Sequence, residues 1–354
     1  MTDTREAIIK RILDKEKSKP EITTFETETL SDLMNDSLPP EEWLIDGIIP
    51  AEGFTFIVGA EATGKSFYTL SIAKAIITKE PWLGQFPVIK QTKILFMDKE
   101  NSRRRTQNRA KGLGIIDHND DIYRIKTPHI FTLTDSKGKF SNNANQLSNL
   151  VREKNIGLII LDSFADFMLG SENSVEDVQK FYSTMRGLFP GIAVLVLHHE
   201  NKPSQGVART SSQRVRGSTN ITAQLVSGFR VFAIPKTTNE FVLEQFKAGD
   251  AEKMKPFKVQ LVSTPSPYDP TKTYVSEVKH NGPYYDEEGK SVLAEDFITE
   301  YLTDNTVGSR SDILSHCVDN GISERTAATV LSDLYNKSIL EKIKEGHKVS
   351  YLLK

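Results

Sequence analysis

The sequence of 354 residues contains a single cysteine, Cys317. One cysteine cannot form an internal disulfide bond and supplies too few thiolates for a metal cluster, which is typical of a reducing compartment. No run of apolar residues approaches the roughly 18 that cross a bilayer. Residues 1–17 also lack the apolar stretch of a signal peptide. We therefore expect a cytoplasmic protein without a membrane partner.

A large excess of charge is also absent, because 45 Lys and Arg residues nearly balance 47 Asp and Glu residues. The formal net charge of −2 excludes a polycation that binds nucleic acid over its whole surface. Any such contact has to come from local basic patches. Hydrophobic residues make up 38% of the chain, which is ordinary for a folded protein. The length of the chain predicts two or three structural units.

Short apolar runs alternate with helical patterns in the middle of the chain. The runs lie at 54–58, 93–98, 157–162 and 192–198, and the helical patterns lie at about 65–78, 102–113, 143–154 and 175–189. Nearly uninterrupted apolar runs are typical of strands that are buried on both faces of a parallel sheet. The alternation therefore predicts an α/β fold with helices on both faces of the sheet.

Further strands are predicted later in the chain, at 228–234, 241–247, 257–262 and 273–279. They suit antiparallel additions at the edge of the sheet. The turn-rich residues 281–290 indicate a boundary. We expect three parts: a charged helix and linker arm over 1–42, an α/β domain over 43–285, and a small C-terminal domain over 291–354.

A glycine-containing loop, 59-GAEATGKS-66, matches the pattern G-x-x-x-x-G-K-[ST] and lies between an apolar run and a helical pattern. Its two glycines permit a tight curl whose N–H groups point at phosphate oxygens. Lys65 can reach the β- and γ-phosphates, and the hydroxyl of Ser66 can hold Mg²⁺. The following helix directs its positive end at the same anion. We predict a site for ATP and Mg²⁺ formed by Gly59, Ala60, Glu61, Ala62, Thr63, Gly64, Lys65, Ser66 and Phe67.

Polar residues end three other apolar runs, at the same edge of the predicted sheet. Asp162 is placed to support the metal ion, and Glu100 could orient or deprotonate the attacking water. Asp162 could instead be an ordinary acid at the end of a strand, and Glu100 could be a solvated acid of a loop. His198 or His199 could sense the γ-phosphate, but adjacent strand residues face opposite ways, so the choice stays open. A zinc site is not expected because its further ligands are missing.

An ordered set of motifs carries a family likeness: GAEATGKS, 96-FMDKEN-101, 158-LIILDS-163, 172-ENS-174, 198-HHENK-202 and 216-RGSTN-220. Together with Trp43 and 46-DGIIPAEG-53, it resembles the RecA-like ATPases of the plasmid RepA type, which include hexameric replicative helicases. The likeness spans about residues 40–265. It implies a RecA-like fold and a homo-oligomer, for which the hexamer is the candidate form. It also implies Glu100 as catalytic base and Asp162 as metal-supporting acid.

Two positions depart from the pattern of that family. Relatives carry an acid about ten residues after the RGS stretch, where this chain has Val226 and Ser227. Relatives also carry a Lys–x–Arg pair on a late strand, and 247-KAG-249 keeps only the lysine. We therefore assign the cation that acts on a neighbouring subunit to Arg230, with Lys247 as the second candidate. Either could instead be a surface charge on an edge strand.

Residues 201–239 contain no Asp or Glu and six basic residues: Lys202, Arg209, Arg214, Arg216, Arg230 and Lys236. In RecA-like rings the corresponding loop lines the central channel and holds the backbone of a single strand. Phosphate contacts of this kind depend strongly on salt. We predict that Lys202, Arg209, Arg214 and Arg216 contact single-stranded DNA. The alternative is a loop that contacts a neighbouring subunit or the nucleotide.

The residues 309–354 resemble a winged helix-turn-helix. Ser309 or Ser311 could cap a first helix that buries Cys317, and Ser323 could cap a second helix over 324–337. Two further apolar stretches, 339–343 and 348–353, predict a β-hairpin. Its residues Lys342, Lys344 and Lys348 are candidates for contact with duplex DNA. Because the second helix is only weakly basic, docking of a protein partner is the alternative.

These features predict an ATP-hydrolysing motor on single-stranded DNA, as in a replicative helicase of a plasmid, phage or other mobile element. The alternative is a DNA-binding regulator or loader that ATP switches and that unwinds nothing. A small-molecule kinase shares the phosphate loop, but the late strands, the basic loop and the C-terminal domain argue against it.

Overall fold

A computed structural model describes the following residues: 27–36, 42–115, 121–126, 141–168, 170–201, 210–235, 237–249, 251–265, 271–345 and 348–354. The chain divides into two units, Met1–Pro40 and Glu41–Lys354. In the first, a short helix, α2 (Leu30–Asn35), interrupts the expected linker arm. It forms because Thr29 and Asp32 cap each other's backbone N–H groups, at 3.0 and 3.1 Å. The helix predicted within residues 1–19 lies outside the described residues.

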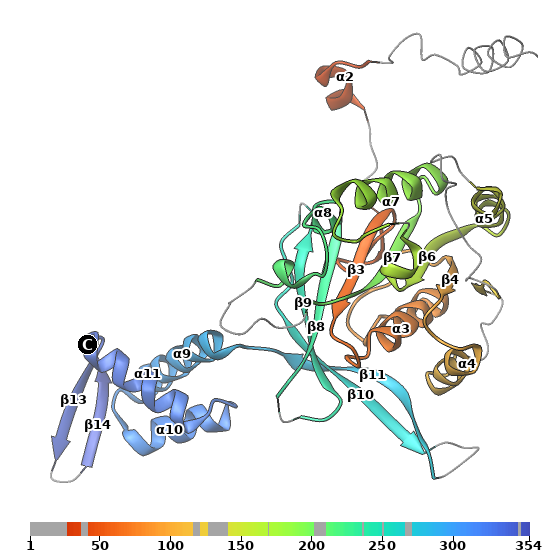
Figure 1. Cartoon of the computed structure of the whole chain (residues 1–354). Helices are drawn as coiled ribbons and strands as arrows, with labels where there is room; N and C mark the ends of the chain where they lie inside the picture. The colour runs from red at the N-terminus through yellow and green to blue at the C-terminus, as the bar shows by residue number, and fades with distance from the viewer. Residues whose placement is uncertain are drawn as a thin grey trace, which may run out of the picture. The chain divides into compact units, whose positions relative to one another are not determined.

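A nine-stranded sheet forms the centre of the second unit (Figure 1). Its order is β5 (Ile122–Arg124), β4 (Lys93–Asp98), β6 (Ile156–Asp162), β7 (Ala193–His199), β3 (Gly53–Gly59), β8 (Ser227–Ala233), β9 (Glu240–Ala248), β10 (Phe257–Pro265) and β11 (Thr273–Pro283). The strands from β5 to β8 are parallel, and β9, β10 and β11 are antiparallel. This confirms the mostly parallel α/β sheet with antiparallel edge strands. One detail was wrong: β8, expected among the antiparallel additions, runs parallel to β3.

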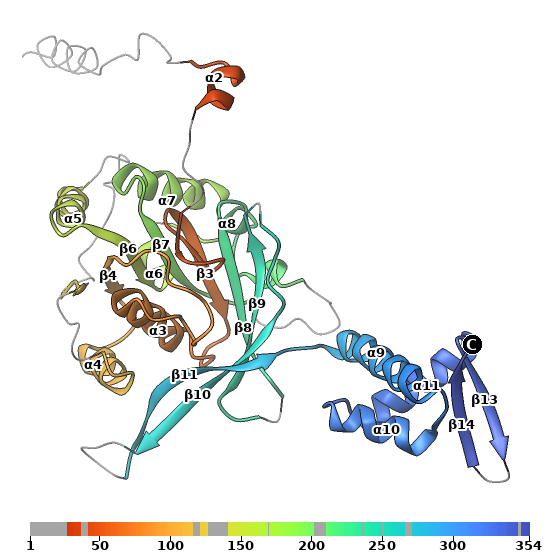
Figure 2. The same cartoon turned by 180° about the vertical axis from the view of Figure 1, so that it is seen from behind.

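Helices cover both faces of the sheet, as predicted (Figures 1 and 2). They are α3 (Lys65–Thr78), α4 (Arg103–Gly112), α5 (Asn142–Glu153), α6 (Phe164–Phe167), α7 (Val175–Leu188) and α8 (Asn220–Ala223). One apolar core joins α3 to the residues of one strand face, and a second joins α5 and α7 to the other face. Strand β7 shows the alternation, because Leu195 and Leu197 belong to the first core and Val194 and Val196 to the second.

A small hairpin of β1 (Trp43–Ile45) and β2 (Ile49–Pro50) leads into β3. Gly47 lies in its turn with a φ of +64°, a conformation that glycine adopts without strain. A methyl group there would also lie 2.6 Å from Met254. The lead-in stretch noted in the sequence therefore forms a tight turn before the strand that carries the phosphate loop.

The C-terminal elements are α9 (Glu287–Asn305), β12 (Gly308–Ser309), α10 (Arg310–Asp319), α11 (Glu324–Asn336), β13 (Leu340–Glu345) and β14 (Lys348–Leu353). Ser309 caps α10 and Ser323 caps α11, at 3.2 and 3.1 Å. A three-stranded sheet has the order β12-β14-β13. Cys317 is fully buried in the local core. Two helices and a hairpin thus lie where the sequence places them, and their assignment to a winged helix-turn-helix stays a prediction.

Helix α9 was not predicted from the sequence. The turn-rich segment 281–290 contains the start of this helix, and Asp286 caps it by accepting from the N–H of Gly289 at 2.8 Å. Ala294, Ile298 and Leu302, four residues apart, bury its inner face. A search of the described residues found no helix that has both the length and the apolar character of a membrane span.

The packing predicts a large difference between two isoleucines. Ile160, in the middle of β6, is 0% exposed, whereas Ile89, outside the sheet, is 55% exposed. We expect Ile160→Ala to lower the free energy of unfolding by about 3 kcal/mol, because it leaves a cavity between packed layers. Ile89→Ala should cost less than about 1 kcal/mol. Urea denaturation of both variants measures the difference, and equal costs would contradict the buried position of Ile160.

Candidate active site

The phosphate loop connects the end of β3 to the start of α3. Gly64, at the N-terminus of α3, has a φ of +83°, and a methyl group there would lie 2.9 Å from Leu261 Cδ1. The side chain of Lys65 folds back over the loop, where Nζ donates to the carbonyl oxygens of Gly59 at 2.8 Å and Ala60 at 2.7 Å. Burial lowers the pKa of Lys65, whereas nearby Glu100 and Asp162 act in the opposite direction. The amino group of Lys65 therefore lies against the backbone of the phosphate loop, close to the carboxylates of Glu100 and Asp162.

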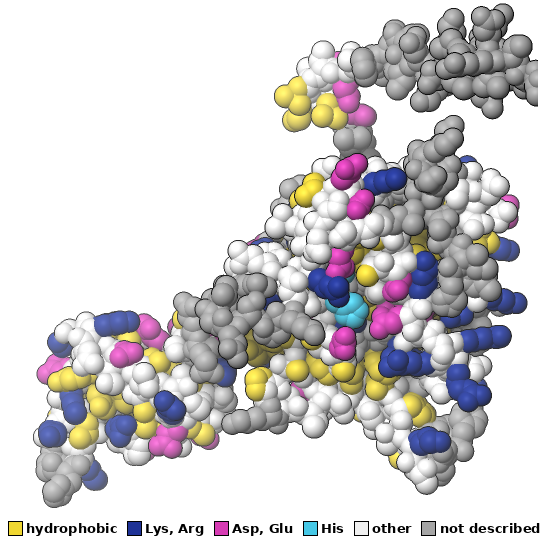
Figure 3. Space-filling view, viewed as in Figure 1, with side chains coloured by type: hydrophobic (Ala, Val, Ile, Leu, Met, Phe, Trp, Pro, Cys, Tyr) yellow, Lys and Arg dark blue, Asp and Glu magenta, His cyan; other side chains and the backbone are white. Residues whose placement is uncertain are grey.

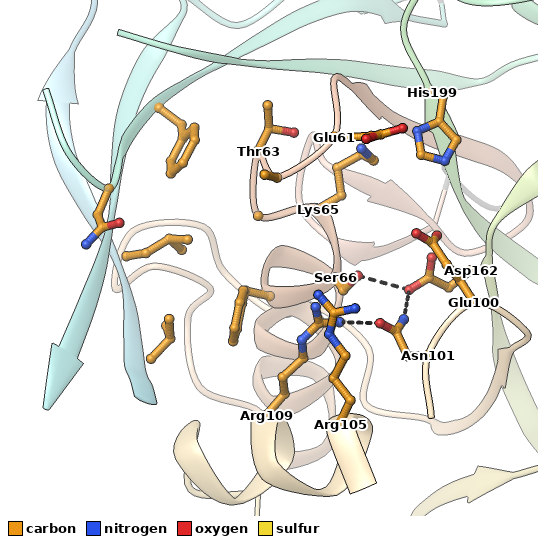
Figure 4. Close-up of a pocket in the computed structure, with 17 residues that line it drawn as sticks. Glu61, Thr63, Lys65, Ser66, Glu100, Asn101, Arg105, Arg109, Asp162 and His199 are labelled. Carbon is orange, nitrogen blue, oxygen red and sulfur yellow. Dashed lines mark hydrogen bonds between the residues drawn. The ribbon is translucent and has the colours of Figure 1, made fainter. Parts of the chain in front are cut away.

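A buried carboxylate faces the first turn of α3. Asp162, at the end of β6, is 1% exposed and accepts from Ser66 Oγ at 3.0 Å (Figure 4). Burial, together with the neighbouring carboxylates of Asp98 and Glu100, raises the pKa of Asp162 to about 7, although the hydrogen bond from Ser66 acts in the opposite direction. A buried carboxylate beside two other acids is stabilised by a bound cation.

Asp98 and Glu100 have different surroundings, although they lie two residues apart. Asp98 is buried, and its carboxylate accepts from the backbone N–H of Asn101 at 2.7 Å and from Thr106 Oγ1 at 2.8 Å. It therefore fixes the turn into α4. Glu100 is exposed and lines the pocket near Asp162 (Figure 4). Asn101 donates to Asp162 Oδ2 at 3.2 Å, so this turn also holds the buried carboxylate.

The two histidines at the end of β7 lie on opposite faces of the sheet. His199 lines the pocket, near Glu61 and Lys65 (Figure 4). His198 is fully buried on the other face, beside Phe56 and Phe164, and its Nε2 lies 2.6 Å from the carbonyl oxygen of Arg216. Burial lowers the pKa of His198 to about 4, so the ring is neutral and Nε2–H donates to that carbonyl. The alternation along one strand separates the two candidates.

The pocket has a volume of about 550 Å³ and includes residues that sequence reasoning missed. Arg105 and Arg109 of α4 lie on one side of the pocket (Figure 4). Arg109 donates to Asn101 at 3.1 Å, and its Cζ atom lies 5.0 Å from the centre of the Phe67 ring. A second wall comes from the late strands and consists of Asn239, Phe241, Leu261 and Val275. The arginine-rich sequence 103-RRRTQNR-109 could have indicated the basic side of the pocket. No short stretch of sequence indicated the apolar wall.

Charge is unevenly spread over this part of the surface. Figure 3 shows side chains of both signs and a histidine gathered over the carboxyl ends of the parallel strands. It also shows Lys and Arg side chains over α4, whose segment 102–112 contains five basic residues and no acid: Arg103, Arg104, Arg105, Arg109 and Lys111. The pocket is therefore bordered by cations on its α4 side, which suits an anionic ligand.

Other predicted residues lie away from the pocket lining. Arg230, on β8, pairs with Glu200 at 2.9 Å. Lys247, on β9, lies 3.5 Å from the carbonyl oxygen of Ala223. Two of the four predicted contacts to single-stranded DNA are described, and both bind acids of their own chain: Arg214 lies 3.6 Å from Glu200, and Arg216 forms an ion pair with Glu172.

The remaining predicted DNA contacts fall into two groups. Lys202 and Arg209 lie outside the described residues. Lys342, Lys344 and Lys348 are exposed on β13 and β14, and the amino group of Lys342 lies over the rings of Tyr335 and Tyr351. These positions are compatible with contact to a phosphate backbone.

The residues of the pocket fit a magnesium nucleotide. The hydroxyl of Ser66 and the carboxylate of Asp162 are oxygen donors of the kind that Mg²⁺ prefers together with phosphates. Among the described residues, no group of three or more His, Cys, Asp or Glu residues has the arrangement of a protein-only metal site. This donor set therefore suits a metal ion that shares its ligands with a bound phosphate.

A parallel sheet with a glycine loop, a lysine and a strand-end aspartate at its carboxyl edge defines a P-loop ATPase. A family model described as "AAA domain" matches residues 19–205, slightly more than half of the 354-residue chain. The chain therefore belongs to the AAA domain family, whose P-loop ATPases typically use ATP with Mg²⁺. The matched segment contains the phosphate loop, Glu100, Asp162 and both histidines.

Solved structures also resemble the chain. One is a KaiC-like protein from the hyperthermophilic archaeon Pyrococcus horikoshii OT3, with 13% sequence identity and a TM-score of 0.44. The match covers 67% of this chain and 93% of that one. A search among curated proteins gave no match.

The buried imidazole predicts a dependence of stability on pH. The pKa of His198 is about 4 in the folded chain and 6.5 as the ordinary value, so between these values the unfolded chain binds a proton that the folded chain does not. Stability therefore falls as the pH falls below 6.5, by about 2 kcal/mol at pH 5. His198→Gln keeps a donor but does not titrate. Urea denaturation at pH 7.5 and 5 should show a smaller pH effect in this variant, and equal effects would contradict the assignment.

Proposed function

We propose that this P-loop ATPase is an oligomeric motor that acts on single-stranded DNA. A replicative helicase of a plasmid, phage or other mobile element is such a motor. The observation that carries the proposal is the convergence of Lys65, Ser66, Glu100, Asp162 and His199 on one pocket. These residues come in the chain order of the RepA-type ATPases. The parallel core sheet with the phosphate loop at its carboxyl edge supports the same class.

In this proposal each pocket residue has one task. Lys65 and the N-terminus of α3 bind the phosphates. Ser66 and Asp162 would hold Mg²⁺, which would supply positive charge to the phosphates when bound. Glu100 orients the attacking water or accepts its proton. His199 contacts the γ-phosphate, whereas His198, buried on the other face, holds the carbonyl of Arg216. Of the two cations proposed to act on a neighbouring subunit, Arg230 is preferred to Lys247.

The nucleobase is proposed to lie against the apolar wall of the late strands. Phe241 and Leu261 are 8% and 7% exposed there, and Asn239 is the uncharged polar residue of that wall. An amide side chain can donate and accept, so it can pair with more than one base. This wall therefore binds a base mainly by contact area and discriminates weakly among bases.

The DNA is proposed to bind the segment that follows β7. Lys202, Arg209, Arg214 and Arg216 supply its positive charge. One backbone contact joins the described part of this segment to β7, and a second joins two residues of the segment itself. Arg216 N–H donates to the carbonyl oxygen of His199 at 3.2 Å, and Asn201 N–H donates to that of Arg214 at 2.8 Å. DNA bound here would lie close to the strand that carries the proposed γ-phosphate sensor.

The C-terminal elements are proposed to form a winged helix-turn-helix domain over residues 291–354, with α9 starting just before it. In that motif α11 is the second helix and the β13–β14 hairpin is the wing. Lys342, Lys344 and Lys348 on the hairpin favour contact with duplex DNA, and docking of a protein partner is the alternative. These elements suit equally the second candidate function, an ATP-switched regulator or loader on DNA.

The first test is ATP hydrolysis by the purified protein with and without single-stranded DNA. We expect DNA of any sequence to stimulate turnover, and the stimulation to weaken steeply with salt. Glu100→Gln should lower turnover by about 10²–10⁴-fold while MgATP still binds, because only the water-activating carboxylate is lost. Arg214→Ala and Arg216→Ala should bring the ratio of stimulated to basal turnover toward one. Basal hydrolysis indifferent to single strands would contradict the motor and favour the regulator.

The apolar wall generates a second prediction. ATP, GTP and CTP should have kcat/KM values within about tenfold of one another, because few polar groups face the base. Leu261→Ala should raise the KM for each nucleotide by roughly tenfold through lost apolar contact. Inhibition by inorganic tripolyphosphate, which has no base, is the control and should stay unchanged in this variant. Strong preference for a single base in the wild-type protein would contradict the proposed wall.

A further inference from the structure

Arg230, the cation proposed to act on a neighbouring subunit, is held by groups of its own chain. Its Nε and Nη2 atoms donate to Glu200 Oε1 at 3.1 and 2.9 Å. The guanidinium lies over the ring of Phe232 at 4.4 Å, and Nη1 is 3.8 Å from Glu244 Oε2. Two donors on one oxygen, an aromatic face and a second carboxylate restrict the direction of this side chain.

Glu200 is also connected to the nucleotide pocket of its own chain. It follows His199, which lines that pocket, and its backbone N–H donates to the carbonyl oxygen of Gly59 at 3.2 Å. The same carbonyl accepts from Lys65 Nζ at 2.8 Å. A change in the phosphate loop therefore reaches the backbone of Glu200 through one hydrogen bond.

The ion pair is sheltered from water. The side chain of Glu200 is 8% exposed and that of Arg230 is 14% exposed. Sheltered pairs of this kind add little net stability, because desolvation offsets much of the attraction, but they fix geometry when both partners are present. Loss of Glu200 would leave Arg230 free to turn toward Glu244 or solvent.

We infer that Glu200 is a positioning residue. It orients Arg230 toward the pocket of the adjacent subunit and makes that orientation depend on the phosphate loop of its own subunit. This inference rests on the proposed function, because it requires Arg230 to act on a neighbour. It adds a route by which the pocket of one subunit sets the turnover of the next.

Mixed assemblies test the inference. The acceptor is Arg230→Ala, which keeps its pocket but lacks the cation. The first donor is Glu100→Gln, which keeps the cation and the phosphate loop but lacks the carboxylate proposed to activate water. We expect ATP hydrolysis to return when acceptor and donor are mixed, because each donor supplies Arg230 to an acceptor pocket. A second donor, Glu100→Gln/Glu200→Gln, should restore roughly tenfold less turnover, since its Arg230 is no longer oriented.

The donors share an inactive pocket, so a difference between them cannot come from chemistry at the donor's own site. The matched control donor is Glu100→Gln/Arg152→Ala, because Arg152 is exposed on α5 and donates to Asn149. It should restore as much turnover as the first donor. Sedimentation of each mixture checks that all donors assemble equally. A fourth donor carries Glu200→Asp, which keeps the negative charge, and it should restore an intermediate turnover.

The outcomes separate the inference from the proposed function. Equal restoration by the donors with and without Glu200→Gln would overturn the positioning role and leave Arg230 as the cation. Failure of the first donor to restore any turnover would overturn the assignment of Arg230 and this inference together, while the wild-type protein remains an ATPase. Absence of ATP hydrolysis by the wild-type protein would overturn the proposed function itself.

Discussion

The buried carboxylate of Asp162 is the constraint on which the carboxyl edge of the sheet depends. Its pKa of about 7 reflects burial first and the neighbouring acids second. Two donors, Ser66 Oγ and Asn101 Nδ2, satisfy one of its oxygens. Neither donor carries a positive charge, so a bound cation would stabilise the ionised carboxylate further. A magnesium ion shared with phosphate oxygens would supply this charge, as proposed for Ser66 and Asp162.

Three elements take their positions from this carboxylate. Strand register places Asp98 beside Asp162 at the ends of β4 and β6. Ser66 brings the first turn of α3 to the same point, and Asn101 brings the turn that precedes α4. Because Asp98 also accepts from Thr106, α4 is fastened to the acids, and its arginines reach the pocket wall. The positions of the α4 arginines in the pocket wall therefore depend on the carboxylates at the ends of β4 and β6.

Local patterns were enough to predict the core strands, the covering helices and the phosphate loop. Each depends on residues close together in the chain, such as the fixed spacing from Gly59 to Ser66. The apolar wall could not be predicted, because Phe241 and Leu261 meet the loop only through the order of the late strands. The start of α9 was not predicted because Gly289 is typical of a turn. In the structure its N–H instead donates to Asp286, which caps the helix.

The choice between His198 and His199 shows how a sheet can connect two sites. Strand alternation alone directs His199 into the pocket and His198 to the opposite face, where it holds the carbonyl of Arg216. Because the two residues are adjacent on one strand, a displacement of His199 would also displace His198. The hydrogen bond from His198 to the carbonyl of Arg216 is partly buried, and its loss would deprive both groups of this partner. The residues Arg214 and Arg216 are thus hydrogen-bonded to the end of β7 and the residues that follow it, so the proposed DNA-binding segment contacts the strand whose His199 lines the nucleotide pocket.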